Sequence, residues 1–389
     1  MNKIKSKALF LAIIGLSATF FSNDFGVIDI EKTAIIVALG IDIDESEGYI
    51  VSTQIATPDP ASEANVLNDQ TTIEGKGKTI AQAVDNVGKN TGWYPLLTYC
   101  QLIILGEKVL DTDIMDILGV FVRTDKVPSS ALVAICEGKA KEVLSATSPL
   151  DSVSSFAIEK ILVKQIAKTD CVAMVNVKDF ACGYYGISGF SYAPYIKTVD
   201  TDAKNTAGGE SEKSQTTSLF DVTQTCYFDK GMSKGKLNPS QTLIFNILGK
   251  KTLEAYLTLE NIEIFGQKAD ATFNIENFSS NKKVIADENG LTLDISLNAT
   301  LALRDANKTG DLKSLSAIVD IPDAVLNAAE LELKEIIQSI FIKTQEEKCD
   351  VFKIGETLFK FDYNNYEKFK DKIFNSKLNL TIKCNSVKK

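Results

Sequence analysis

The chain of 389 residues contains no histidine. Histidine is the usual general base near neutral pH and the commonest zinc ligand, so its absence excludes Ser-His-Asp and Cys-His catalytic arrangements. An excess of positive charge is also missing, because the formal net charge is −9. Nucleic-acid binding needs a basic face, and we therefore expect no nucleic-acid partner. An enzyme of this composition would have to use carboxylates, a lysine or a carboxylate-bound metal.

Closely spaced cysteines are missing as well, since none of the seven cysteines belongs to a C-x-x-C pair. Metal-site and thiol-redox motifs therefore have no support. Most of the cysteines follow apolar or strand-like residues, as in T-Y-C-Q-L-I-I-L, and we interpret them as small buried core residues. One or two disulfides are the alternative, and the odd count would then leave at least one thiol free.

The N-terminus has a short positive segment followed by an apolar run. Lys3, Lys5 and Lys7 precede the apolar residues 8–21. This order is typical of a secretory signal, and the run is shorter than the roughly 20 apolar residues that span a bilayer. We predict that residues 1–23 form a signal peptide or an N-terminal membrane anchor, with the folded part outside the cytoplasm. A buried N-terminal core helix is the alternative.

Apolar runs and amphipathic patterns alternate through residues 24–198, which we predict to form an N-terminal α/β domain. The first two strands are expected to pair as a hairpin, because the turn-forming stretch E-S-E-G-Y lies between them. Thr79 is expected to cap a helix, since apolar residues follow it at helical spacing. The predicted strands cover residues 32–44, 49–57, 100–105 and 131–136, and the predicted helices begin after Thr79, near Asp111 and Asp113, and at Asp151.

Residues 199–218 contain no large apolar residue after Val199, which predicts a polar linker or an exposed loop. A C-terminal α+β domain is predicted for residues 219–389. It should contain a hairpin of residues 282–286 and 291–297 around Asn289-Gly290, a long helix after Pro322, a helix carrying Tyr366, Phe369, Ile373 and Phe374, and a final strand at 378–384. The fold class is therefore α+β or mixed α/β, in two to three domains of mixed sheets with amphipathic helices.

Two short motifs invite a ligand-binding interpretation, and each has a simpler one. Asp42 and Asp44 form a D-x-D that suits a divalent ion, but strands commonly end in solvated carboxylates. The segment E-G-K-G-K-T at 74–79 lacks the spacing of a phosphate-binding loop and fits a strand end followed by a helix N-cap. Trp93 suits either an aromatic pocket or a loop anchor. We predict no catalytic residues, no metal and no cofactor. A carboxylate-dependent hydrolase is an alternative class of function.

Several segments together resemble one known family. The first half contains I-E-K-T-A-I-I-V-A-L-G-I-D, Y-I-V-S-T-Q-I-A-T-P, G-K-G-K-T-I-A-Q-A, C-Q-L-I-I-L-G-E and R-T-D. The second half contains F-D-K-G-M-S-K-G-K-L-N-P-S-Q-T and K-T-Q-E-E-K-C-D-V-F-K-I-G-E. In this order and spacing, from about residue 25 to about residue 385, they resemble the Ger(x)C family, the C subunits of spore nutrient-germinant receptors.

The resemblance has one marked departure. Members of the family usually carry a lipid-modified cysteine shortly before the first strand, which would fall near Asp24, but the first cysteine of this chain is Cys100. We therefore expect an uncleaved N-terminal helix, rather than a lipid, to hold the protein at the membrane, or else a secreted product.

The family motifs are matched best at nine positions. We interpret these positions as structural, with glycines for turns and polar side chains that close loops, and direct contact with a partner is the alternative. They are Gly40, Asp42, Gln54, Pro58, Gly75, Gly235, Gln345, Asp350 and Gly355.

The resemblance implies a non-enzymatic receptor subunit at the outer face of the spore inner membrane. It further implies assembly with the other germinant-receptor membrane subunits and a role in nutrient-triggered germination. A free-standing extracytoplasmic binding protein with the same fold is the alternative, which the missing cysteine makes plausible.

Overall fold

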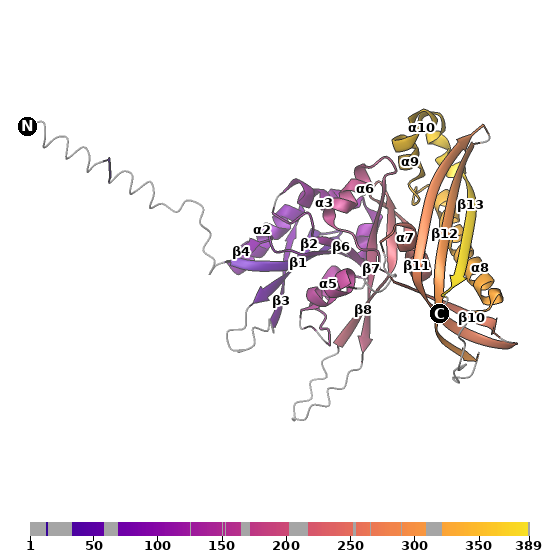
Figure 1. Cartoon of the computed structure of the whole chain (residues 1–389). Coiled ribbons are helices and arrows are strands. Elements are labelled where there is room, and N and C mark those ends of the chain that lie inside the picture. The colour runs from indigo at the N-terminus through magenta and orange to yellow at the C-terminus, as the bar shows by residue number, and fades with distance from the viewer. Residues whose placement is uncertain are drawn as a thin grey trace, which may run out of the picture.

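The computed structural model of the chain contains two β-sheets with helices packed on them (Figure 1). It describes residues 13–14, 33–57, 69–308 except 125, 150, 152, 165–171, 202–216, 252–253, 265 and 289, and residues 321–387. The mixture of sheets and helices confirms the predicted α+β class. The predicted N-terminal segment 1–23 lies almost wholly outside the described residues. Within the described part of the chain, no helix combines the length and the apolar character needed to cross a bilayer.

The first sheet is mixed, and its strands run in the order β3-β2-β1-β5-β6-β7-β8-β9, with β4 paired to β1. The pairs β1–β5, β5–β6 and β6–β7 are parallel, whereas β1–β2, β2–β3, β7–β8 and β8–β9 are antiparallel. The strands are β1 (Thr33–Asp44), β2 (Gly48–Thr57), β3 (Asp69–Gly77), β4 (Tyr94–Leu96), β5 (Leu102–Leu105), β6 (Leu132–Cys136), β7 (Phe190–Thr201), β8 (Thr217–Asp229) and β9 (Met232–Leu237).

Helices cover both faces of this sheet, which explains why the central strands are continuous apolar runs. On β5, Ile103 packs into the core beneath α2, α3 and α6, whereas Leu102 and Ile104 pack into the core beneath α4 and α5. The helices are α2 (Ile80–Thr91), α3 (Ile114–Arg123), α4 (Ala140–Ser145), α5 (Ser154–Lys164) and α6 (Val177–Tyr185), with a 3-10 turn η2 (Glu107–Asp111).

The second sheet has the order β10-β11-β12-β13 and carries its own helices. The apolar stripe of α8 packs into the core of this sheet, as its spacing predicts. The strands are β10 (Ala255–Ile264), β11 (Gln267–Asp287), β12 (Gly290–Lys308) and β13 (Lys377–Ser386). The helices are α7 (Pro239–Leu248), α8 (Asp323–Glu346), α9 (Ile354–Phe361) and α10 (Tyr363–Phe369), followed by a 3-10 helix η4 (Lys370–Asn375).

Most predicted elements are present, with some differences in extent. The hairpin of β1 and β2 is confirmed, and Thr79 caps α2 by accepting the backbone N–H of Gln82. Asp113 caps α3, whereas Asp111 lies in the preceding 3-10 turn. The second hairpin is longer than predicted and closes with Asp287 opposite Gly290. The predicted last helix is divided between α10 and η4.

The predicted polar segment 199–218 is flanked by two strands that pair with each other. Thr201 lies opposite Thr217 in the β7–β8 pair, and residues 202–216 are outside the described part. Strands β8 and β9 therefore extend the first sheet, although the predicted second domain begins at residue 219. Pairing between distant strands is set by the assembled sheet and not by local composition. The domain boundaries themselves stay predictions.

Five of the seven cysteines are buried core residues, as predicted. Cys100, Cys136, Cys226, Cys349 and Cys384 are buried free thiols. Burial raises the pKa of each of these thiols. The thiol of Cys182 on α6 is exposed, and Cys171 lies outside the described residues.

Candidate functional site

Three of the motif positions hold α4 against the first sheet. A Cβ at Gly40 would lie 2.9 Å from Cδ1 of Leu144, so the absent side chain lets the helix approach β1. The Asp42 carboxylate accepts the backbone N–H of Ala140 at 2.9 Å and of Lys141 at 3.2 Å, which satisfies the first turn of α4. Burial raises the pKa of Asp42, while these two bonds act in the opposite direction.

Gln54 joins the end of α4 to the start of α5. Its Nε2 donates to the carbonyl of Leu144 at 2.9 Å and to the Ser154 hydroxyl at 3.1 Å, and its Oε1 accepts the N–H of Ser155 at 3.2 Å. The side chain is fully buried. Asp44, the second member of the D-x-D, instead accepts the N–H groups of the turn residues Ser46 and Glu47. The Asp42 carboxylate therefore accepts from the start of α4, and the Asp44 carboxylate accepts from the turn after β1.

The glycine motif positions permit close packing or an unusual backbone angle. A Cβ at Gly75 would lie 2.0 Å from the carbonyl oxygen of Ala83, because α2 packs directly on β3. Gly235 has φ +146°, and a Cβ there would lie 2.9 Å from the Tyr227 hydroxyl. Pro58 lies outside the described residues.

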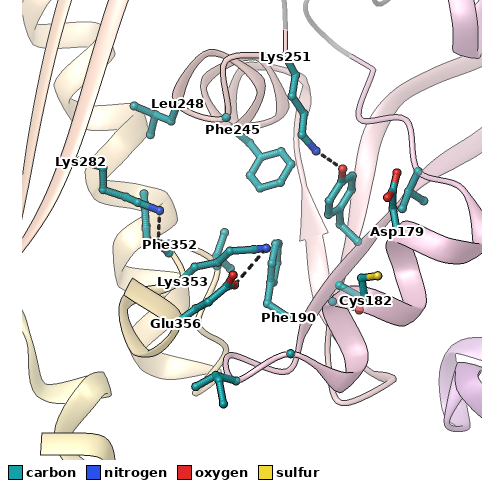
Figure 2. Close-up of a pocket in the computed structure, with 18 of the residues that line it drawn as sticks. Asp179, Cys182, Phe190, Phe245, Leu248, Lys251, Lys282, Phe352, Lys353 and Glu356 are labelled. Carbon is teal, nitrogen blue, oxygen red and sulfur yellow. Dashed lines mark hydrogen bonds and ion pairs between the residues drawn. The ribbon is translucent and has the colours of Figure 1, made fainter. Parts of the chain in front are cut away.

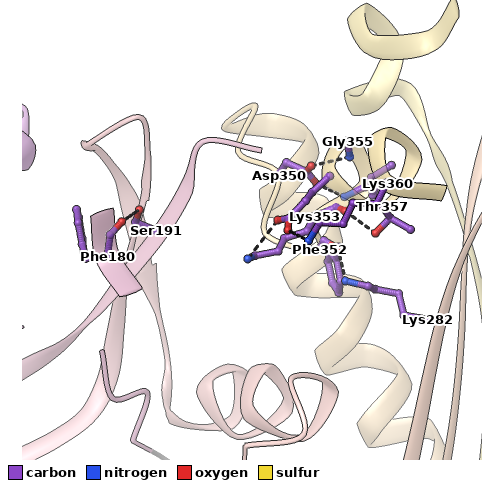
Figure 3. A network of polar contacts seen from close by, with 11 residues as sticks. Phe180, Ser191, Lys282, Asp350, Phe352, Lys353, Gly355, Thr357 and Lys360 are labelled. Carbon is purple, nitrogen blue, oxygen red and sulfur yellow. Dashed lines mark hydrogen bonds and ion pairs between the residues drawn. The ribbon is translucent and has the colours of Figure 1, made fainter. Parts of the chain in front are cut away.

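Two of the last three motif positions, Asp350 and Gly355, lie at the start of α9 (Figure 3). The Asp350 carboxylate accepts the N–H of Ile354 at 2.7 Å and of Gly355 at 2.8 Å, and its burial raises its pKa to about 6. A Cβ at Gly355 would lie 2.9 Å from Ile373, so this glycine allows α9 to contact η4. Gln345, near the end of α8, donates to the Ser376 hydroxyl at 3.2 Å.

We call the first sheet with its helices the first unit, and the second sheet with its helices the second unit. A cavity of about 750 Å³ lies between the first sheet and the helices of the second unit (Figure 2). One side is formed by α6 and β7, and the other by the end of α7, by β11 and by the start of α9. Its position between two packed units is where ligand sites commonly occur in proteins. None of the eight motif positions that the structure describes lines it.

Aromatic rings form one wall of this cavity. The ring of Phe190 lies 5.9 Å from that of Phe245, and the ring of Tyr192 lies 5.0 Å from that of Phe245, both at steep interplanar angles. Phe352 and Phe359 add rings from the opposite side. Such a surface binds a flat apolar group by contact with ring faces and edges.

Lysines from three separate segments enter the same space. Lys251 follows α7, and its ammonium group donates to the Tyr192 hydroxyl and lies 4.2 Å from the centre of that ring. Lys282 on β11 donates to the backbone carbonyl of Phe352. Lys353, just before α9, forms an ion pair of 3.3 Å with Glu356. Figure 2 shows the three side chains pointing toward the cavity from different elements.

The protein around Lys251 and Lys282 disfavours their charged forms. Desolvation lowers the pKa of Lys251 to about 8, with repulsion from Lys353 as the next contribution. Desolvation also lowers the pKa of Lys282, where Asp350 opposes the effect and Lys353 adds to it. Both side chains are nevertheless exposed, because they border an open cavity. Both residues therefore present side-chain surface to the cavity.

Sequence reasoning missed this cavity, and no local signal marks it. Its lysines are separated by as many as about one hundred residues, and none stands in a motif with another. The segment from Lys343 to Glu356 was singled out for its family resemblance, yet its helix α9 was not predicted. Only the folded chain, which places α6 and α9 on opposite sides of the cavity, brings the lysines and the aromatic rings together.

Comparisons with known proteins give a consistent result. A family model described as the spore germination protein N-terminal domain matches residues 26–198, and one described as spore germination B3/GerAC like, C-terminal, matches residues 223–387. The spore germination protein KC of Bacillus subtilis (strain 168) is 20% identical over 378 residues, which cover 94% of this chain and 90% of that protein. The crystal structure of the GerBC protein superposes with a TM-score of 0.54 at 16% identity, covering 92% of this chain and 100% of that chain.

Proposed function

The chain belongs to the GerAC-like family of spore germination proteins, and on this premise we propose that it is a non-enzymatic subunit of a spore germinant receptor. The observation that carries the proposal is the match of both family domains, in order, along nearly the whole chain. The superposition with the GerBC protein supports the same fold over 92% of the chain. The predicted partners are the other membrane subunits of such a receptor.

Assembly is tested by purifying the tagged protein from the inner membrane of spores after mild cross-linking. Co-purification of the membrane subunits at a constant ratio would support the receptor subunit. A protein recovered alone from the soluble fraction would instead support the free-standing extracytoplasmic binding protein. That second candidate is favoured by one observation, the lack of a cysteine before Cys100.

We further propose that the apolar residues 8–21 stay attached and hold the protein at the outer face of the membrane. Exposed aromatic residues near the first described strand support this orientation. Thr33, where β1 begins, lies opposite Tyr94 in the β1–β4 pair. Trp93, Tyr94 and Tyr99 are 49%, 44% and 58% exposed. Tryptophan and tyrosine favour the membrane–water interface, and the twelve residues from Phe21 to Thr33 reach at most about 40 Å.

The test uses Trp93, the only tryptophan of the chain. The full-length protein is reconstituted into liposomes, and its fluorescence is quenched by lipids brominated near the headgroup. Strong quenching is expected for the natural chain. The control carries Trp93→Tyr together with Tyr185→Trp, which moves the fluorophore to α6, and should be quenched weakly.

The two parts of this proposal fail in different ways. A protein that does not float with the liposomes would contradict membrane attachment altogether. A protein that floats but shows equal, weak quenching in both variants would retain the attachment and contradict the orientation.

A further inference from the structure

We propose that the cavity between α6 and α9 binds a small organic anion, specifically a carboxylate carried on a flat apolar body. The inference goes beyond membership of a receptor, since it assigns a ligand class to this chain itself. It depends on three observations: unmatched positive charge, an aromatic wall and access from solvent.

Positive charge exceeds negative charge around the cavity. Four lysines line it against two carboxylates, those of Asp179 and Glu356. Glu356 is occupied by ion pairs with Lys353 and Lys360. Among the described residues, no carboxylate lies within ion-pair distance of Lys251 or Lys282, whose ammonium groups donate only to a hydroxyl and a carbonyl. Two charged donors are therefore available to an incoming anion.

Lys353 repels both Lys251 and Lys282 across the cavity. Lys353 destabilises the charged forms of both Lys251 and Lys282, so it lies close enough to each for their charges to interact. Bringing like charges together costs free energy unless an anion is shared between them. A bound carboxylate has two oxygens and accepts from more than one ammonium group. The arrangement is thus better suited to an occupied cavity than to an empty one.

The rest of the lining selects an apolar body rather than a bare ion. Phe190, Tyr192 and Phe245 form a ring cluster beside Lys251. Phe352, whose backbone carbonyl accepts from Lys282, also lines the cavity. A flat aromatic or unsaturated group would contact these rings while its carboxylate faced the lysines. Inorganic phosphate has no apolar surface that could contact these aromatic rings.

A second cavity of about 1050 Å³, beside Asp42 and Glu107, shows the contrast. It is rich in charge of both signs, and three of its lysines already have carboxylate partners. These ion pairs are Lys76–Glu47, Lys141–Glu74 and Lys236–Glu107. Unmatched charge combined with an aromatic wall therefore distinguishes the cavity between α6 and α9.

The test probe is 4-fluorobenzoate, followed by ¹⁹F NMR line broadening with the full-length protein in detergent. Saturable broadening is expected, and benzylamine, with the same ring and the opposite charge, should not compete. Lys251→Met and Lys282→Met each remove one charged donor and retain the apolar stem, so each should weaken binding about tenfold. Lys334→Met, on the exposed face of α8, makes the same change in net charge and should leave binding unchanged.

The dependence of binding on pH provides a second readout. The groups facing the Lys251 ammonium are the Tyr192 hydroxyl, the Asp179 carboxylate and the ammonium group of Lys353. Affinity for 4-fluorobenzoate should fall as the pH rises through about 8, where Lys251 loses its proton. In the Lys251→Met variant this decline should be reduced.

Specific results would overturn the proposal. Absence of saturable broadening at millimolar probe with the folded natural chain would do so. Equal binding in the folded Lys251→Met, Lys282→Met and Lys334→Met variants would show that the lysines take no part. Equal competition by benzylamine would show a merely apolar site, and equal competition by inorganic phosphate would show a charge site without the apolar component. Folding of each variant is checked by its urea-unfolding midpoint.

Discussion

Asp42 and Asp350 each use a carboxylate to accept two backbone N–H groups in the first turn of a helix. The first four N–H groups of a helix lack partners within it, so this contact replaces a side-chain cap that the N-cap residue itself does not supply. Lys139 and Lys353 occupy the N-cap positions of α4 and α9, and neither side chain accepts a hydrogen bond from its helix. In both cases the acceptor is a buried carboxylate, and burial raises its pKa.

The pKa of Asp350 leads to a prediction about stability and pH. Its folded value of about 6 exceeds the ordinary value of 3.8, so between these values the folded state binds a proton that the unfolded state lacks. Stability contributed by this proton is present at low pH and is lost as the pH rises through about 6. Relative to Asp350→Asn, the natural chain should lose on the order of 2–3 kcal/mol of unfolding free energy between pH 4 and pH 7.

The measurement is urea unfolding of both proteins across this pH range. Comparison of the two profiles removes the contributions of the other carboxylates. Glu347→Gln, which removes an exposed carboxylate nearby, is the control for net charge. A difference between the natural chain and Asp350→Asn that stays constant, or that grows with pH, would contradict the assignment.

At the scale of elements, helices approach strands closely where a glycine leaves space. Gly75→Ala should destabilise the protein by about 2–4 kcal/mol, because its Cβ would meet the backbone of α2 at Ala83 and Val87 and would push the helix off β3. Gly119→Ala is the matched control. Its Cβ would meet only the mobile end of Arg123, and alanine favours the interior of α3, so we expect no loss of stability. Equal effects of the two changes on the urea midpoint would refute this explanation.

Local periodicity predicted those elements whose pattern reflects one buried face. The helix after Thr79 and the stripe of α8 follow helical spacing, and their apolar residues are indeed buried. Helices α4, α6, α7 and α9 were not predicted. Helix α7 begins at Asn238-Pro239, where a capping box forms, but its residues are buried on several sides and show a weaker pattern. Helix α9 is short, and its N-cap Lys353 supplies no side-chain acceptor; Asp350, four residues before Ile354, accepts the first-turn N–H groups instead, which is not a usual N-cap signal.

Contacts between distant segments were not predictable in the same way. The parallel pairing of β12 with β13 joins strands separated by the whole of α8, α9 and α10. The motif positions Asp350 and Gly355 are close in sequence and form a hydrogen bond. In contrast, Lys251, Lys282 and Lys353 come from separate segments and line one cavity only because the chain folds. Composition indicates neither the register of a sheet nor which lysines converge. The cavity was therefore visible only in the folded chain.

At the scale of the whole molecule, one apolar cluster includes residues of both sheets. Phe190, Tyr227 and Leu237 of the first sheet pack in the same apolar cluster as Ile244 and Leu293 of the second unit. Polar contacts cross the same boundary: Lys343 donates to the carbonyl of Lys236 at 3.1 Å, and Asn246 donates to that of Val172 at 3.0 Å. Figure 1 shows α7 between the two sheets, where it contributes to this junction.

A shared apolar cluster predicts cooperative unfolding of both units, and the buried cysteines report on each. Cys100 and Cys136 lie in the first unit, and Cys349 and Cys384 lie in the second, all as buried free thiols. Pulsed alkylation at increasing urea, read for each cysteine by mass spectrometry, should give coincident midpoints for the four thiols. Exposed Cys182 should react without urea and serves as the internal control. Midpoints that separate into two groups, one for each sheet, would show that the junction is too weak to couple the units.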